Sequence, residues 1–200
     1  MHQRGRSIIA VVLTWALAWV AGHVTAGAEQ AQQRQFVAPP PGFAEACKRY
    51  RWICEDRGRA GTEIGELLPI AEQINRRVNA SVRELTDAEN YGANDYWTLP
   101  RNGSGDCEDF VLQKYSLLLA AGVDSRDLSI AVAINREGEN HAVLVLRAPR
   151  GDLVLDNLTS QIRPWNQTGY RFLAMQTSAD KQKWEVVAHQ PLDSQILAQR

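Results

Sequence analysis

The stretch Gly103-Ser104-Gly105-Asp106-Cys107-Glu108-Asp109-Phe110 marks the point where an aperiodic segment gives way to a helical pattern. Apolar residues then recur at helical spacing, and the pattern stops at Gly122, a residue suited to the left-handed conformation that ends many helices. Cys107 is therefore expected in the first turn of a helix. The helix N-terminus offers partial positive charge and unpaired N–H groups, and both favour a thiolate.

Short apolar runs follow this helix, and turn residues separate them. The runs are Leu128 to Ile134, Ala142 to Leu146 and Leu153 to Leu158, which predict an antiparallel meander, with Phe172 to Met175 and Trp184 to Ala188 as further strands. Upstream, apolar spacing from Thr62 to Val78 predicts a helix with Thr62 as a candidate N-cap, in which Pro69 either kinks the helix or begins a new one. Residues 79–105 show no period and predict a long loop. Helices followed by a sheet indicate an α+β fold.

His141 and Asp156 are the candidate partners of Cys107. His141 stands at the start of one predicted strand and Asp156 at the end of the next, and these positions are neighbours in an antiparallel hairpin. An imidazole can take the proton of a thiol, and a carboxylate can fix the tautomer of the imidazole. The sequence therefore predicts a Cys107-His141-Asp156 triad.

Structural explanations remain open for each member of this triad. Cys107 fits a small buried hydrophobe, His141 a strand-edge histidine with one hydrogen bond, and Asp156 the turn chemistry common in Asp-Asn pairs. Asp152 is the reserve candidate for the carboxylate, although Gly151-Asp152 resembles a hairpin turn. His189 falls in an expected C-terminal tail and is a poor candidate.

The N-terminus has the pattern of a secretory signal. Arg4 and Arg6 precede an apolar run from Ile8 to Val20, and Ala26-Gly27-Ala28 has small residues at the positions that signal peptidase recognises. We expect a signal peptide over residues 1–28, a flexible leader over 29–42 and one domain over 43–200, in the periplasm or secreted. A retained membrane anchor is less favoured, because the run is shorter than the roughly 20 residues that span a bilayer.

The charge balance excludes a nucleic-acid-binding footprint. The chain has 22 basic and 23 acidic residues, so loss of Arg4 and Arg6 with the signal would change the formal net charge from −1 to −3. Export also permits a disulfide, and of the three cysteines Cys47 and Cys54 are the natural pair, which leaves Cys107 free. A continuous helix would hold their Cα atoms about 10.5 Å apart, beyond the roughly 7 Å that a bridge spans, so a bridge requires a bend. Two buried thiols are the alternative.

These segments together resemble the bacterial transglutaminase-like cysteine proteinases, a family that includes periplasmic LapG-type proteases of large surface adhesins. The resemblance covers most of the expected domain, and its most specific block surrounds Cys107. The other blocks are Asn90-Tyr91-Gly92, Asp95-Tyr96-Trp97, His141-Ala142-Val143-Leu144-Val145, Leu153-Val154-Leu155-Asp156-Asn157-Leu158 and Thr168-Gly169-Tyr170. The resemblance implies a papain-like, transglutaminase-like core, the triad named above and cleavage of a peptide bond in a protein substrate such as a cell-surface adhesin. A regulatory protein at the inner membrane would be a further partner.

In LapG-type members the resemblance also implies calcium bound by acids beside the nucleophile, which correspond to Asp106 and Glu108. Physical chemistry supports this expectation, because Asp106, Glu108 and Asp109 would raise the pKa of a thiol among them, and an oxygen-ligated dication would offset that repulsion. The alternative is that these acids only favour the N-terminal end of the helix.

Two other functions are compatible with the same residues. An amine in place of water would make the chain a transglutaminase that joins proteins, and loss of catalysis would leave a partner-binding adaptor of the same fold. An intact triad argues against the adaptor.

Overall fold

The computed structural model describes residues 34–56 and 64–187. The predicted signal peptide, Thr62 and His189 lie outside these ranges. Four helices are described: α1 (Phe43–Arg49), α2 (Ile64–Ser81), α3 (Asp87–Tyr91) and α4 (Cys107–Ala120). Three short 3-10 turns complete the helical elements, η1 (Arg51–Ile53), η2 (Ser125–Asp127) and η3 (Trp165–Gln167). No helix in the two described ranges is both long enough and apolar enough to span a membrane.

The described structure also contains a seven-stranded sheet, and all of its neighbouring strands are antiparallel. Its strands are β1 (Phe36–Val37), β4 (Leu128–Ile134), β5 (Asn140–Leu146), β6 (Leu153–Leu155), β7 (Arg163–Pro164), β8 (Arg171–Gln176) and β9 (Trp184–Val186). Their spatial order is β1-β9-β8-β4-β5-β6-β7. The meander predicted by the sequence is thus present from β4 to β7, whereas β8 returns to the other side of β4. Strand β1 forms within the segment predicted as a leader and pairs with β9.

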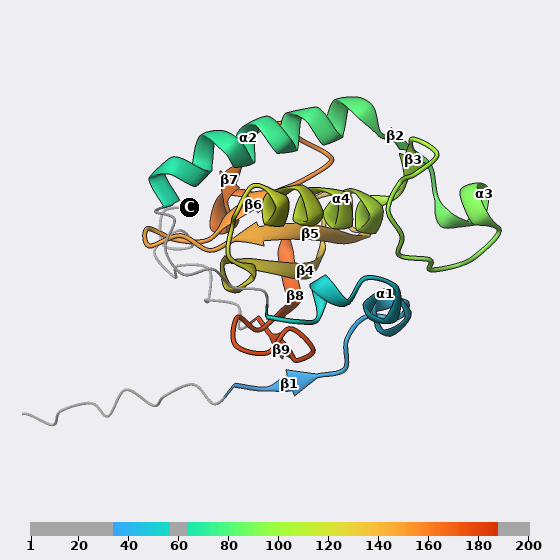
Figure 1. Cartoon of the computed structure of the whole chain (residues 1–200). Helices are drawn as coiled ribbons and strands as arrows, with labels where there is room; N and C mark the ends of the chain where they lie inside the picture. The colour runs from blue at the N-terminus through green and yellow to red at the C-terminus, as the bar shows by residue number, and fades with distance from the viewer. Residues whose placement is uncertain (1–33, 57–63, 188–200) are drawn as a thin grey trace, which may run out of the picture. The chain divides into compact units, whose positions relative to one another are not determined.

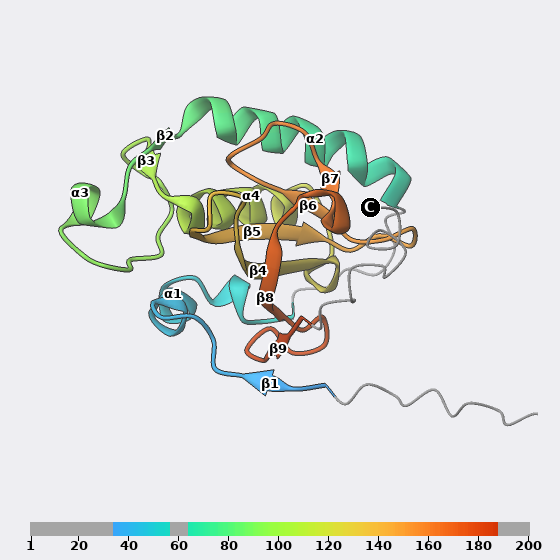
Figure 2. The same cartoon turned by 180° about the vertical axis from the view of Figure 1, so that it is seen from behind.

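Helix α4 and strand β5 form the centre of the fold. Ala142, Leu144 and Leu146 on one face of β5 belong to the same buried cluster as α4 residues such as Leu112 and Leu118. Val143 and Val145 pack in a second cluster on the opposite face, as period-two alternation requires. Helix α2 lies on the outer side of α4 (Figures 1 and 2). This packing places the first turn of α4 next to the beginning of β5.

Residues 79–105 are more structured than the predicted loop. They contain the end of α2, the helix α3, and a small parallel pair formed by β2 (Arg83–Glu84) and β3 (Ser104–Gly105). Helix α3 begins with a capping box in which the Thr86 side chain accepts from the Glu89 N–H and the Glu89 side chain accepts from the Thr86 N–H. The Thr-x-x-Glu spacing that produces this cap is visible in the sequence and was the missed signal.

Two further elements differ in detail from the prediction. Pro69 lies inside α2, which continues through it to Ser81. Strand β6 ends at Leu155 and not at Leu158, because the Asp156 carboxylate accepts a hydrogen bond from the Leu158 N–H at 3.1 Å and turns the chain out of the ladder. The α+β class is confirmed.

Candidate active site

Cys107 occupies the first turn of α4, as the sequence predicts. Its Sγ accepts a hydrogen bond from the backbone N–H of Ala142 at 3.4 Å, so the thiol lies against the beginning of β5. The thiol itself donates to the Glu108 carboxylate at 2.9 Å. Burial raises the pKa of Cys107 well above its ordinary value, and the charge of Glu108 adds to this effect. The helix N-terminus therefore does not by itself make the thiolate the favoured form.

His141 and Asp156 form a buried pair beside this thiol. The His141 Nε2 lies 2.8 Å from the Asp156 Oδ1, and the two residues are 6% and 3% exposed. Pairing of Leu144 with Leu155 on β5 and β6 brings the two strand ends together. Although burial raises the pKa of Asp156, hydrogen bonds from His141 and Tyr170 outweigh it and hold that pKa below its usual value. The carboxylate is thus charged and oriented toward the imidazole.

The structure brings all three predicted residues into one region. His141 directly precedes Ala142, whose N–H contacts the Cys107 sulfur. Because the Asp156 carboxylate engages Nε2, the His141 Nδ1 is the ring nitrogen available to a thiol. No hydrogen bond joins the thiol to His141 within the described ranges, since Cys107 donates to Glu108. A triad would require the Cys107 thiol to donate to the His141 Nδ1 in place of Glu108.

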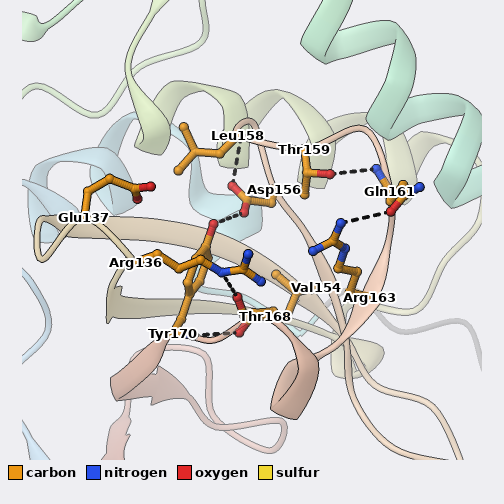
Figure 3. Close-up of a pocket in the computed structure, with 10 residues that line it drawn as sticks. All are labelled: Arg136, Glu137, Val154, Asp156, Leu158, Thr159, Gln161, Arg163, Thr168 and Tyr170. Atoms are coloured by element: carbon orange, nitrogen blue, oxygen red, sulfur yellow. Dashed lines mark hydrogen bonds between the residues drawn. The ribbon is translucent and has the colours of Figure 1, made fainter.

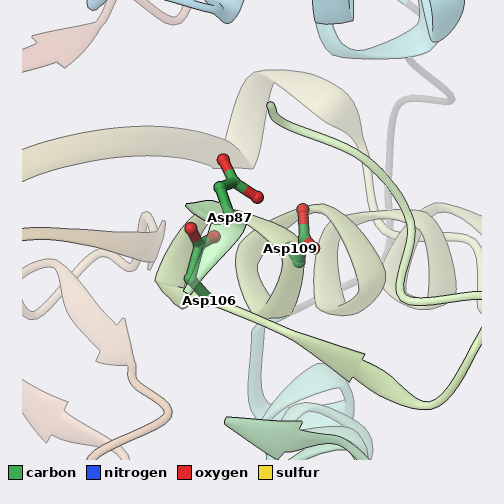
Figure 4. A group of neighbouring side chains, drawn as sticks. All are labelled: Asp87, Asp106 and Asp109. Atoms are coloured by element: carbon green, nitrogen blue, oxygen red, sulfur yellow. The ribbon is translucent and has the colours of Figure 1, made fainter. Parts of the chain in front are cut away.

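Three acidic side chains converge beside the first turn of α4. Asp87, Asp106 and Asp109 each place a carboxylate oxygen within 4.8 Å of the others (Figure 4). One oxygen of each has no hydrogen-bond partner, namely Asp87 Oδ1, Asp106 Oδ1 and Asp109 Oδ2. Burial, together with the neighbouring acids, raises the pKa of Asp106 to about 7 and that of Asp109 to about 8. Three buried, unpaired acceptors at this spacing fit a hard cation such as calcium.

The acidic group overlaps only in part with the ligands expected from the sequence. Asp106 belongs to it, whereas Glu108 does not and instead accepts from Cys107. Asp87 and Asp109 also accept backbone hydrogen bonds from Tyr96 and Thr98, the latter at 2.8 Å. These bonds connect the acidic group to the segment that follows α3. Asp87 lies too far from Cys107 in the sequence for spacing to have suggested it.

The remaining predictions for the site can be placed as well. Cys47 and Cys54 form a disulfide with Cα atoms 5.7 Å apart, and the required bend occurs where α1 ends at Arg49 and η1 begins. Cys107 is the free cysteine. The reserve candidate Asp152 lies 3.7 Å from Arg147, and its described interactions do not include His141.

Comparison with known families decides the assignment. Residues 33–191 match the bacterial transglutaminase-like cysteine proteinases, which is most of the chain. The chain belongs to this family.

One solved structure agrees with membership of this proteinase family, and two others are reported with it. Calcium-bound LapG of Legionella pneumophila has a TM-score of 0.50 and 26% identity, and the match covers 65% of this chain and 78% of that one. EGTA-treated LapG and a further LapG structure from the same organism are 33% and 32% identical, with TM-scores of 0.46 and 0.47. Each of these two matches covers 52% of this chain and 60% of the LapG chain. No curated protein matched the sequence. The family match shows that the fold of the chain is transglutaminase-like and that its family is one of cysteine proteinases.

Proposed function

We propose that this family member is an exported cysteine endopeptidase that cleaves a peptide bond through Cys107, His141 and Asp156. The observation that supports it best is the buried His141-Asp156 pair, with 2.8 Å between Nε2 and Oδ1, next to the strand residue whose N–H contacts the Cys107 sulfur. A catalytic thiol, a base and an orienting carboxylate are the three groups that a thioester mechanism needs.

In the proposed reaction, His141 takes the proton of Cys107, and the sulfur attacks the carbonyl carbon of the scissile bond. The Cys107 backbone N–H and a second donor from the Tyr96–Trp97 region would stabilise the oxyanion. The imidazolium then returns the proton to the leaving amine as the C–N bond breaks. Water resolves the thioester, with His141 taking a proton from that water, and regenerates the thiol. Asp156 holds the imidazole in place throughout.

The acidic group would hold a calcium ion through Asp87, Asp106 and Asp109, whose unpaired oxygens and raised pKa values fit such a ligand set. Bound there, calcium would supply positive charge beside a thiol that must become anionic. Glu108 is the other ligand predicted from the sequence. To bind the same ion, its carboxylate would have to give up the hydrogen bond from Cys107. A structural neighbour, LapG of Legionella pneumophila, is described as calcium-bound.

The proposed substrate is a protein outside the cytoplasm, with a cell-surface adhesin as the class suggested by the family resemblance. The proposed compartment is the periplasm or the exterior, and an inner-membrane regulatory protein is the proposed partner. The disulfide between Cys47 and Cys54 supports an oxidising compartment.

The test compares the full chain with its Cys107→Ala variant on an extract of exported proteins in calcium. We expect new protein N-termini, detected by amine labelling and mass spectrometry, with the native chain and none with Cys107→Ala. Both proteins should unfold at similar temperatures, because a half-buried thiol becomes a methyl group. Equal numbers of new N-termini with both proteins would contradict the proposal.

The same extract separates hydrolysis from acyl transfer. A labelled primary amine is added, and the proposal predicts that cleavage exceeds incorporation. Incorporation without new N-termini would indicate a transglutaminase.

A further inference from the structure

The segment Thr168-Gly169-Tyr170 forms a tight turn before β8 and has no part in the reaction described above. The Thr168 hydroxyl accepts from the Tyr170 N–H at 3.1 Å and donates to the Trp165 carbonyl at 2.8 Å. Gly169 has φ of 76°, a conformation that favours glycine. A Cβ at Gly169 would also lie 2.9 Å from the Arg136 Nε, which donates to the Thr168 carbonyl at 2.6 Å. The hydrogen bonds of Thr168 and Arg136, together with the backbone conformation of Gly169, fix the direction of the Tyr170 side chain.

Tyr170 is aimed at the carboxylate of the proposed triad. Its hydroxyl donates to the Asp156 Oδ2 at 2.5 Å, while the Leu158 N–H donates to Oδ1 (Figure 3). The His141 Nε2 also contacts Oδ1. The tyrosine ring also meets the His141 ring edge to face, with centroids 5.7 Å apart at 89°. The Tyr170 side chain therefore contacts both Asp156 and His141. Tyr170 and Asp156 also line a cavity of about 260 Å³.

We propose that Tyr170 is a positioning residue that fixes the Asp156 carboxylate and sets the proton affinity of His141. The Thr168-Gly169 turn and Arg136 hold it in place for this role. The inference rests on the proposed function, because it assigns Tyr170 to the same site. Tyr170 would be a fourth residue beside the proposed triad. It acts through Asp156 and makes no contact with the reacting atoms.

The tyrosine acts by drawing charge from the carboxylate. A hydroxyl that donates to Oδ2 disperses the negative charge that Oδ1 presents to the imidazole. Burial and the bond to Asp156 raise the pKa of Tyr170, which keeps the hydroxyl protonated as a donor. Loss of the hydroxyl would leave a fuller charge facing Nε2. The imidazolium would then be more stable, and His141 would bind its proton more tightly.

Several elements place other charged or titratable groups near His141 and Asp156, and the Tyr170→Phe substitution changes none of them. They are Cys107 and Lys114 on α4, Arg136 and Glu137 on the turn between β4 and β5, and Arg163 on β7. Lys114 is buried and interacts electrostatically with Asp156. Since Tyr170→Phe changes none of these groups, a shift at His141 reports the lost hydroxyl.

The test is an NMR titration of ¹⁵N-labelled histidine in the full chain, which needs no substrate. The background is Cys107→Ala, so that the thiol does not titrate with the imidazole. We expect Tyr170→Phe to raise the His141 pKa by about half a unit to one unit, which is less than the roughly one to two units of a direct hydrogen bond to a charged group, because the hydroxyl acts on His141 through Asp156. The His141 signal is assigned by its loss in His141→Gln.

The matched control is Tyr115→Phe. Tyr115 is buried on α4, and its hydroxyl has no hydrogen-bond partner in the described structure, so its removal should leave His141 unchanged. Gly169→Ala is the second variant, because strain and the contact with Arg136 should displace Tyr170 and raise the His141 pKa in the same direction. A Tyr170→Phe shift no larger than that of Tyr115→Phe overturns the proposal. So does a fall in the His141 pKa. Either result leaves the peptidase proposal, which depends on cleavage, to be judged separately.

Discussion

Cys107 illustrates what the sequence reveals at the scale of single residues. Its place in the first turn of a helix and the pairing of His141 with Asp156 both followed from order and period along the chain. The acids around Cys107 were also predicted to raise its pKa, and Glu108 and Asp106 do so, but the larger cause is burial, which depends on packing and cannot be read from the local sequence. Tyr170 was missed for a related reason. It reaches Asp156 from the turn before β8, and no spacing in the sequence predicts that contact.

Glu108 gives a direct prediction at this scale. In calcium-free protein, Glu108→Gln removes a negative charge that accepts a hydrogen bond from the thiol, so the pKa of Cys107 should fall by about one unit. The thiolate absorbance in the ultraviolet measures it, since Cys107 is the free cysteine. Glu72→Gln is the control, because Glu72 is a half-buried acid on α2 that pairs with Arg76. An unchanged or higher pKa in Glu108→Gln would show that Glu108 does not hold the thiol protonated.

Among the elements, those with strong periodicity were predictable. The helices α2 and α4 and the strands β4, β5 and β8 follow their apolar patterns closely. The elements between α2 and α4 were not predicted, because α3 is one short helix fixed by its capping box and β2 pairs only with β3 over two residues. This region completes the acidic group, because Asp87 is the first residue of α3 and its carboxylate accepts a hydrogen bond from the Tyr96 N–H. A loop without period thus supplied one of the candidate metal ligands.

Helix α2 also supports the site in a way that its apolar face does not reveal. Asn75 and Asn79 lie one turn apart, and their side-chain amides donate to carbonyl oxygens of Asp156, Thr159 and Ser160 at 2.7 to 3.2 Å. The segment after β6 is therefore tied to α2 while its first residue, Asp156, faces His141. Asparagines at i and i+4 are visible in the sequence, but their partners lie more than 70 residues away.

At the scale of the whole molecule, the acidic group couples stability to pH and to calcium. The folded-state pKa values of Asp106 and Asp109, about 7 and about 8, lie above the values of about 4 expected in an unfolded chain. The calcium-free folded state therefore keeps protons that the unfolded state loses. Its free energy of unfolding should fall as pH rises from about 4 to about 8, by up to about 1.4 kcal/mol per pH unit for each carboxylate. Calcium would replace those protons, so it should increase the free energy of unfolding most near pH 8.

Thermal unfolding by circular dichroism at several pH values, with calcium or with a chelator, checks this prediction. Tm in calcium should exceed Tm in chelator by more at pH 8 than at pH 5, and magnesium should not reproduce the difference. Cleavage activity should disappear in chelator. Asp109→Asn is the matched variant, and it should raise the chelated Tm at pH 8 while abolishing the response to calcium. A calcium-independent Tm at pH 8, or full activity in chelator, would contradict the cation site.

The central claim is that Cys107 is a nucleophile activated by His141 and Asp156, and its rate of alkylation tests this most directly. In calcium near neutral pH, iodoacetamide should modify Cys107 at least about 10-fold faster than a model thiol of ordinary pKa, because the imidazole stabilises the thiolate. His141→Gln should remove that advantage. Alkylation no faster than the model thiol, or equally fast in His141→Gln, would contradict the account.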